Sequence, residues 1–263
     1  MASAAIDGVP RGTRRQDWPP LPEPEHRPLH RAVLTALGPV AGARLLDVGC
    51  GVGLMLRSAE SRGALVSGVD TAVELLEIAR WALPDADLRV GDVDALPFDN
   101  GTFDVVTACT AVPHGGVDRT AVLAELVRVV RPGGRVAVGG WVHPAGCWAQ
   151  DFAAQLRRLT LREPVDLDAD PGLDADLRAA GLTVVAAGDV GCLAVYPDLS
   201  AAWTALLGSE QLLTAIRVAG ERAVHDAFLA SVEPAVTPDG TVRLSKAFRY
   251  AVALVPDMEC YTA

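Results

Sequence analysis

Lysine is nearly absent from this sequence, and basic residues form no long run. Lys246 is the only lysine, and adjacent arginines occur only as pairs, at positions 14–15 and 157–158. The 263-residue chain has a formal net charge of −10. Nucleic-acid binding depends on clustered Lys and Arg side chains that neutralise phosphates. We therefore expect no DNA or RNA substrate.

Cysteines are also few, and long apolar runs are missing. The five cysteines are odd in number and contain no Cys-x-x-Cys pair, which is typical of a reducing compartment. Every apolar run is shorter than the ~20 residues of a membrane span, and residues 1–15 lack the apolar centre of a secretory signal. The sequence thus predicts a cytoplasmic protein with no membrane partner.

Glycine recurs at close spacing in residues 44–54. An apolar strand ends near Asp47, and glycines follow at positions 49, 51 and 53 before a helical pattern begins. Glycine lets the backbone approach a ligand closely, and the start of a helix has unpaired N–H groups. The spacing lacks the third glycine of a dinucleotide-binding loop, because Leu54 takes that place. A carboxylate at Asp47 suits a ligand with an ammonium group better than one with a pyrophosphate.

Two further acids follow the next predicted strands. Asp70 ends the apolar run 64–69, at the spacing where an acid typically binds both ribose hydroxyls of an adenosine. Asp92 and Val93 follow the run 88–90, where a carboxylate and a backbone amide could read an adenine edge. Aspartates are also common as helix N-caps, but their combination with the glycine loop favours a nucleotide-type cofactor.

These segments resemble the class I S-adenosylmethionine (SAM)-dependent methyltransferases. Residues 46–53 are similar to the first motif of that family, 66–70 to its ribose-binding strand and 91–98 to its adenine loop. Residues 103–107 and 126–138 resemble its fourth strand and its helix, turn and fifth strand. Residues 17–18, 25–29, 196–199 and 239–250 resemble an actinobacterial subgroup that acts on small molecules.

The resemblance implies SAM as cofactor and S-adenosylhomocysteine as its product. The expected cofactor-binding residues lie at the ends of successive strands: Asp47, Gly49, Gly51, Asp70, Thr71, Asp92, Val93, Cys109 and Thr110. Cys109 and Thr110 are expected to contact the methionine part through their backbone.

Alternating patterns predict an α/β, doubly wound Rossmann-like fold. Its seven-stranded sheet is expected to be mostly parallel with an antiparallel last strand. Strands are predicted at 43–48, 64–69, 86–90, 103–109, 134–141, 182–187 and within 242–254, and helices at 27–37, 52–62, 71–82, 118–130 and about 148–161.

Domain organisation can also be predicted. Residues 1–25 contain prolines that exclude a regular helix, and we expect a lead or lid there. Residues 26–263 are expected to form one methyltransferase domain with a helical cap inserted at about 200–232. The aspartates between positions 166 and 176 are interpreted as a solvated loop, since the spacing lacks the glycine and closing glutamate of an EF-hand.

Histidines and aromatics supply the candidates for chemistry. His114 and His143 follow the fourth and fifth strands and are candidate general bases, although each could instead be a loop histidine bonded to backbone. Trp18, Trp141 and Tyr196 are candidates for a substrate pocket, although large aromatics also fill cores. No pattern of residues indicates a metal site.

The sequence therefore predicts an EC 2.1.1-type methyltransferase that modifies O, N or C of a small molecule. We expect a role in secondary metabolism and natural-product biosynthesis, and a monomer or homodimer. Two alternatives stay open: an enzyme of this fold that binds SAM but catalyses cyclisation or isomerisation, and a non-catalytic SAM-binding subunit. Intact cofactor motifs are compatible with all three.

Overall fold

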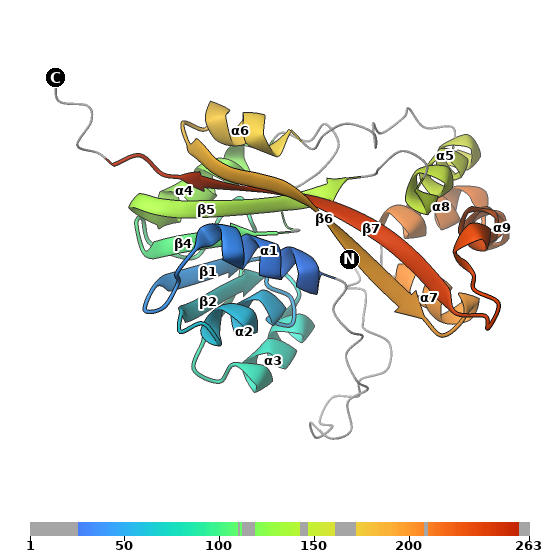
Figure 1. The fold of residues 1–263 in the computed structure, drawn as a ribbon, viewed down its shortest axis with the longest axis horizontal. Coiled ribbons are helices and arrows are strands. Elements are labelled where there is room, and N and C mark those ends of the chain that lie inside the picture. Colours follow the sequence, from blue (N-terminus) through green and yellow to red (C-terminus); the bar gives the residue numbers. More distant parts are fainter. Residues whose placement is uncertain are drawn as a thin grey trace. The chain divides into compact units, whose positions relative to one another are not determined.

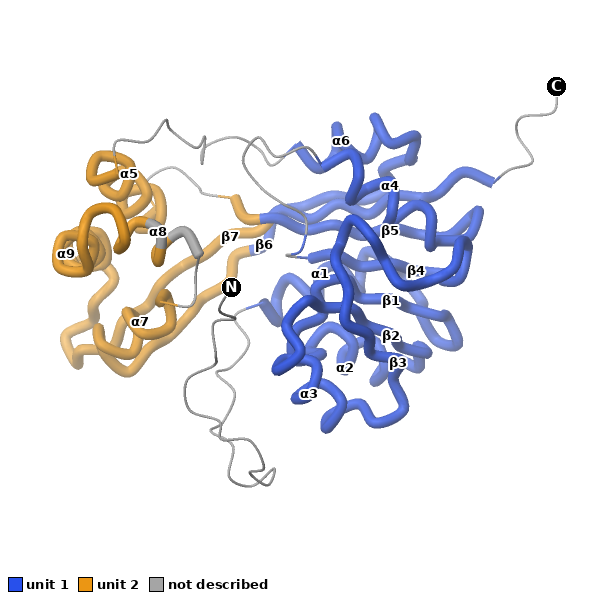
Figure 2. The backbone as a smooth tube through the Cα atoms, turned by 180° about the vertical axis from the view of Figure 1, so that it is seen from behind, with its two compact units in different colours: residues 1–140, 171–190, 249–263 blue, residues 141–170, 191–248 orange. Residues whose placement is uncertain are grey.

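The computed structural model describes residues 26–109, 111, 119–142, 147–160, 172–207 and 210–257. The chain forms two compact units (Figure 2). Unit 1 comprises residues 1–140, 171–190 and 249–263, and unit 2 comprises residues 141–170 and 191–248. The predicted lead 1–25 lies outside the described residues, and the single-domain organisation stays a prediction.

A seven-stranded sheet has the order β3-β2-β1-β4-β5-β7-β6 (Figure 1). The strands are β1 Arg44–Val48, β2 Leu65–Asp70, β3 Asp87–Val90, β4 Phe103–Ala108, β5 Val130–Val142, β6 Thr183–Tyr196 and β7 Val242–Leu254. Strands β1 to β5 pair in parallel. The end of β7 meets the start of β5, where Gly133 donates to Val255 and Val255 donates to Gly134, so β7 is antiparallel. The predicted fold class is confirmed.

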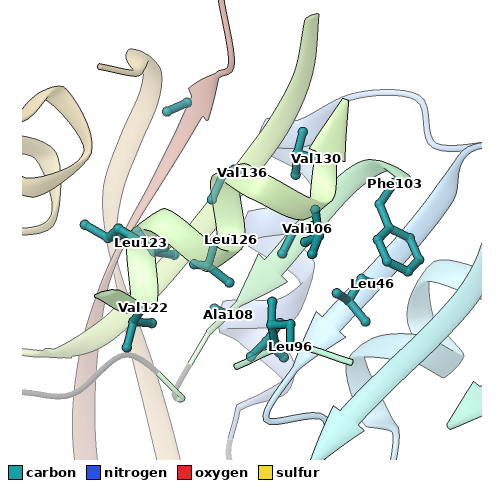
Figure 3. Close-up of a cluster of buried hydrophobic side chains, with 14 of the residues drawn as sticks. Leu46, Leu96, Phe103, Val106, Ala108, Val122, Leu123, Leu126, Val130 and Val136 are labelled. Carbon is teal, nitrogen blue, oxygen red and sulfur yellow. The ribbon is translucent and has the colours of Figure 1, made fainter. Parts of the chain in front are cut away.

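Helices of unit 1 cover both faces of the sheet. On one face, Leu46 of β1 and Val106 of β4 pack with Leu126 of α4 (Thr120–Val129) in a buried apolar cluster (Figure 3). On the other face, Gly68 of β2 lies against Leu56 of α2 (Leu54–Glu60). The remaining helices of the unit are α1 Arg27–Leu37, α3 Val73–Ala82 and α6 Leu173–Ala179.

Unit 2 has an aromatic core of its own. Its helices are α5 Trp148–Thr160, α7 Leu199–Leu206, α8 Glu210–Ala219 and α9 Glu221–Val232. The ring of Phe228 on α9 lies 5.9 Å from that of Phe152 and 5.4 Å from that of Trp203. The stretch expected to hold a helical insertion therefore contains α7, α8 and α9.

Three expectations were wrong in detail. Asp174 and Asp176 lie on α6, where a loop was expected; this helix forms because Leu177 is fully buried, and its acids bond to Arg249 and Arg119. The fifth strand starts at Val130, four residues earlier than expected, because a register shift before Val105 accommodates the Pro-Gly-Gly turn. The sixth strand also extends further than expected, to Tyr196.

Candidate functional site

The carboxyl edge of the parallel strands brings three acids together. Asp47 is the penultimate residue of β1, Asp70 ends β2, and Asp92 comes two residues after β3. Because Val48 pairs with Val69 and Asp70 with Val90, these strands end at neighbouring positions. The sheet order reverses between β1 and β4, and ligands of doubly wound folds bind at such a point.

The three glycines of the loop after β1 serve different purposes. All have positive φ, between 51° and 80°, a region that favours glycine. A Cβ at Gly49 would come 2.6 Å from Ala111, and one at Gly53 would come 2.9 Å from Leu83. A Cβ at Gly51 would meet only Leu75, at 4.0 Å, among the described residues. Gly51 is therefore the glycine with space beside it for a ligand, whereas the other two permit close packing within the protein.

Asp70 holds the glycine loop in place. Its Oδ2 accepts a hydrogen bond of 2.8 Å from Gly51 N, and its Oδ1 accepts one of 2.9 Å from Ala72 N. Gly49 N and Cys50 N also donate to the carbonyl of Val69, one residue earlier. The loop amides at positions 49 to 51 are thus bonded to β2, although the sequence suggested that amides here face the ligand. Each carboxylate oxygen of Asp70 keeps a second lone pair with which to accept a hydroxyl.

Asp47 is a buried carboxyl group with an unusual protonation equilibrium. Its side chain is only 4% exposed, and its Oδ1 accepts a hydrogen bond of 2.6 Å from the Thr107 hydroxyl on β4. Burial raises the pKa of Asp47 to about 7, the hydrogen bond from Thr107 opposes that rise, and the charge of Asp70 adds to it. A ligand that brings positive charge to this position would favour the ionised form.

The loop after β3 begins against β2. Gly91 N donates to the carbonyl of Asp70, and Ala95 N donates to that of Asp92. Val93 packs against the buried cluster of unit 1, while the side chain of Asp92 is exposed. This geometry leaves the carboxylate of Asp92 able to accept a hydrogen bond from a ligand.

The other expected cofactor residues lie near the same edge. Thr71 is exposed in the turn after β2. Cys109 is buried directly after β4, and its carbonyl oxygen lies 2.7 Å from where a Cβ at Gly139 would be. Glycine at position 139 thus lets β5 approach this residue closely.

Four expected site residues, Trp18, Thr110, His114 and His143, lie outside the described part of the chain. Trp141 and Tyr196 belong to unit 2. The ring of Trp141 lies 4.4 Å from that of the fully buried Phe248, and Lys246 Nζ lies 5.0 Å from the Trp141 ring. Tyr196 packs against the apolar core of unit 2.

One cavity lies away from this edge, and the described residues contain no metal cluster. A cavity of about 490 Å³ is lined by Arg44, Asp87 and Phe103, the first residues of β1, β3 and β4, and so lies toward the opposite edge. No three His, Cys, Asp or Glu side chains of the described residues are grouped to hold a metal ion. No described helix has the length and apolar character needed to cross a membrane.

Comparison with known proteins identifies the segment that carries the acids. Residues 46–138 match the model of the family described as "Methyltransferase domain". This segment is a class I SAM-dependent methyltransferase domain. Its cofactor is SAM.

Two relatives are similar to this chain over part of its length. A demethylmenaquinone methyltransferase of Renibacterium salmoninarum is 36% identical over 114 residues, which cover 43% of this chain and 48% of the relative. A ubiquinone biosynthesis O-methyltransferase of Xanthomonas oryzae pv. oryzae is 36% identical over 125 residues, which cover 46% and 52% of the two chains. The alignments thus span about half the length of these curated relatives.

Solved structures show the same fold over most of the chain. The [4+2]-cyclase SpnF has a TM-score of 0.54 and 22% identity, and the match covers 87% of this chain and 81% of that protein. At this identity the likeness concerns the fold alone.

Proposed function

We propose that this protein transfers a methyl group from SAM to an O, N or C atom of a small molecule. The observation that carries the proposal is Asp47, a buried acid beside Asp70 on the edge of a methyltransferase domain. The names of two relatives of this chain describe methyltransferases of quinone biosynthesis, which supports a small-molecule acceptor. Cytoplasmic location, a role in secondary metabolism and a monomeric or homodimeric state stay predictions.

The residues at the edge of the sheet have separable tasks in this proposal. Asp47 pairs with the ammonium group of the cofactor, and Asp70 accepts its ribose hydroxyls while fixing Gly51. Asp92 and the Val93 amide hold the adenine. When bound, SAM supplies a methyl group activated by its sulfonium. The protein contributes chiefly by orientation and exclusion of water, which can account for several kcal/mol of the barrier.

Trp141 and Tyr196 are proposed to contact the acceptor. Trp141 is only partly buried and is supported by Phe248 behind its ring, so it can offer a fixed aromatic face to a planar acceptor. Tyr196 is proposed to add a polar contact. Trp203, in contrast, is buried in the core of unit 2, as expected for a structural aromatic.

Incubation with SAM labelled in its methyl group tests the function. We expect label to appear in an acceptor from a panel of hydroxylated aromatic compounds, amines and enolisable carbon acids. Calorimetric titration with S-adenosylhomocysteine serves as the independent measure of cofactor binding. Binding without transfer to any acceptor would favour a SAM-binding protein that is not a methyltransferase.

A general base at His114 or His143 is a further prediction. We expect His→Ala at one of these positions to lower turnover about 10²-fold with SAM affinity intact, because a positioned base typically contributes 10²–10⁴ in rate. Turnover between pH 6 and 9 is the measurement. His225→Ala is the matched control, since His225 is a half-buried histidine of α9 whose ring makes a T-shaped contact with Trp203. Full turnover in both His114→Ala and His143→Ala would indicate that the protein only aligns the acceptor with the methyl group and uses no general base.

The fold neighbour SpnF supports one alternative. Its name describes a cyclase rather than a methyltransferase, and the cofactor motifs are compatible with either chemistry. A substrate isomerised by the protein in the presence of S-adenosylhomocysteine, without consumption of SAM, would distinguish this function from methyl transfer.

A further inference from the structure

Two residues of α4, Glu125 and Arg128, form hydrogen bonds to the loop after β3. Glu125 and Arg128 lie one helical turn apart and form an ion pair, with 2.6 Å between Arg128 Nε and Glu125 Oε1. Their side chains are 18% and 30% exposed, respectively. The pair thus lies at the surface. Its donors and acceptors that are not used in the ion pair form hydrogen bonds to the loop.

The guanidinium of Arg128 binds the loop at several points. Nη2 donates to the carbonyl of Leu96 at 2.9 Å, and Nη1 donates to the carbonyl of Phe98 at 2.7 Å and to Asn100 Oδ1 at 2.9 Å. The backbone carbonyl of Arg128 accepts a further bond from Gly101 N. A planar fork of donors is needed to reach three acceptors at once, and a lysine ammonium cannot reproduce it.

Glu125 completes the contact from the other side. Its Oε2 accepts hydrogen bonds from Leu96 N at 2.7 Å and from Arg128 Nη2 at 2.8 Å. Both backbone polar groups of Leu96 are therefore bonded to this pair. Hydrogen bonding from Arg128 keeps the pKa of Glu125 below its usual range, so the carboxylate stays ionised at neutral pH.

Leu96 lies three residues after Val93, within the short loop that carries the proposed adenine contacts. The loop is fixed to β2 at Gly91 and closed on itself between Asp92 and Ala95. The buried side chains of Leu96 and Phe98 anchor it to the core. Arg89 of β3 also donates to the carbonyl of Pro97, and Glu125 and Arg128 fix the backbone of the outer half at Leu96 and Phe98.

We propose that Glu125 and Arg128 are positioning residues that hold Asp92 and Val93 in the arrangement that selects adenine. The inference rests on the proposed adenine contacts of these two residues. It predicts that loss of the pair reduces recognition of the base without removing any group that touches the cofactor.

The test compares S-adenosylhomocysteine with S-inosylhomocysteine, in which an oxygen replaces the adenine amino group. The wild-type protein should bind the adenosyl compound at least about 10-fold more tightly, because the Asp92 carboxylate accepts a hydrogen bond from that amino group. Arg128→Lys and Glu125→Gln should bind the adenosyl compound about 10-fold more weakly and lower the preference to about twofold or less. Calorimetric titration gives all affinities, and circular dichroism verifies folding.

Arg131→Ala is the matched control. Arg131 follows α4 closely and forms an ion pair of the same length, 2.6 Å, but its partner Asp104 lies on β4. Its backbone lies beside Gly101, and alanine keeps that backbone while removing the guanidinium. We expect this variant to keep both affinity and base preference. Unchanged base preference in folded Arg128→Lys and Glu125→Gln would overturn the positioning role, as would equal losses in Arg131→Ala. Failure of the wild-type protein to bind S-adenosylhomocysteine would instead overturn the proposed cofactor function.

Discussion

Replacement of Asp70 by alanine should weaken binding of S-adenosylhomocysteine about 10³-fold. The carboxylate has two tasks in the proposed function, since it accepts hydrogen bonds from Gly51 N and Ala72 N in the protein and is proposed to accept the ribose hydroxyls. Each hydrogen bond to a charged group contributes about 1.5–3 kcal/mol. Loss of the ribose contacts and release of the glycine loop together give about 4 kcal/mol, or about three orders of magnitude. Isothermal titration calorimetry measures this loss.

Asp104→Ala is the control for Asp70→Ala. Asp104 also accepts a backbone amide at 2.8 Å, from Arg44 N, and bonds to Arg131, but it lies near the start of β4 and away from the acidic edge. This variant should lose stability and keep its cofactor affinity. Equal affinity of folded Asp70→Ala and wild-type protein would rule out a ribose contact at Asp70.

Asp47 should make cofactor binding dependent on pH. With a pKa of about 7 in the free protein, roughly 10% of Asp47 is ionised at pH 6 and roughly 90% at pH 8. Only the ionised form pairs with the ammonium of S-adenosylhomocysteine, which keeps its proton over this range. Affinity should therefore rise about 10-fold from pH 6 to pH 8. Asp47→Asn should remove this dependence and weaken binding at pH 8 by 10²- to 10³-fold, since a buried ion pair then lacks one partner.

The same residue should affect the free energy of unfolding in the opposite direction. The folded protein keeps a proton on Asp47 up to about pH 7, whereas an ordinary aspartate loses it near 3.8. Between these values the folded state binds more protons than the unfolded state, so the contribution of Asp47 to stability falls as pH rises. Without ligand, Asp47→Asn should thus match wild type near pH 4 and exceed it by up to about 4 kcal/mol at pH 8. Urea unfolding at both pH values measures this difference.

Thr107→Val tests how the hydrogen bond from Thr107 affects the pKa of Asp47 while the Asp47 carboxyl group is kept. The Thr107 hydroxyl stabilises the ionised carboxylate, so its removal should raise the pKa further and move the pH dependence of binding upward by about one unit. Cofactor affinity that is independent of pH in wild type, together with unchanged binding by Asp47→Asn, would contradict the role of Asp47.

The sequence alone determined the order of elements and the edge of the sheet at which the three acids lie. Short apolar strands that alternate with helices and end in glycine or acid are local signals, because each depends on residues close together in the chain. Glycines 49, 51 and 53 marked the loop, and Asp47, Asp70 and Asp92 marked its edge. The approximate limits of most strands followed from the same signals, except where a bulge moved the start of β5 and pairing extended β6.

Only the tertiary structure decided what each of these residues contacts. Thr107 reaches Asp47 across 60 positions because β1 and β4 are neighbours in the sheet, and Glu125 reaches Leu96 across 29 positions because α4 packs over the loop after β3. Asp174 and Asp176 gained basic partners in the same way, through β7 and the start of α4. Such contacts leave no periodic pattern in the sequence, since they arise from the pairing of strands and the packing of helices that bring distant residues together.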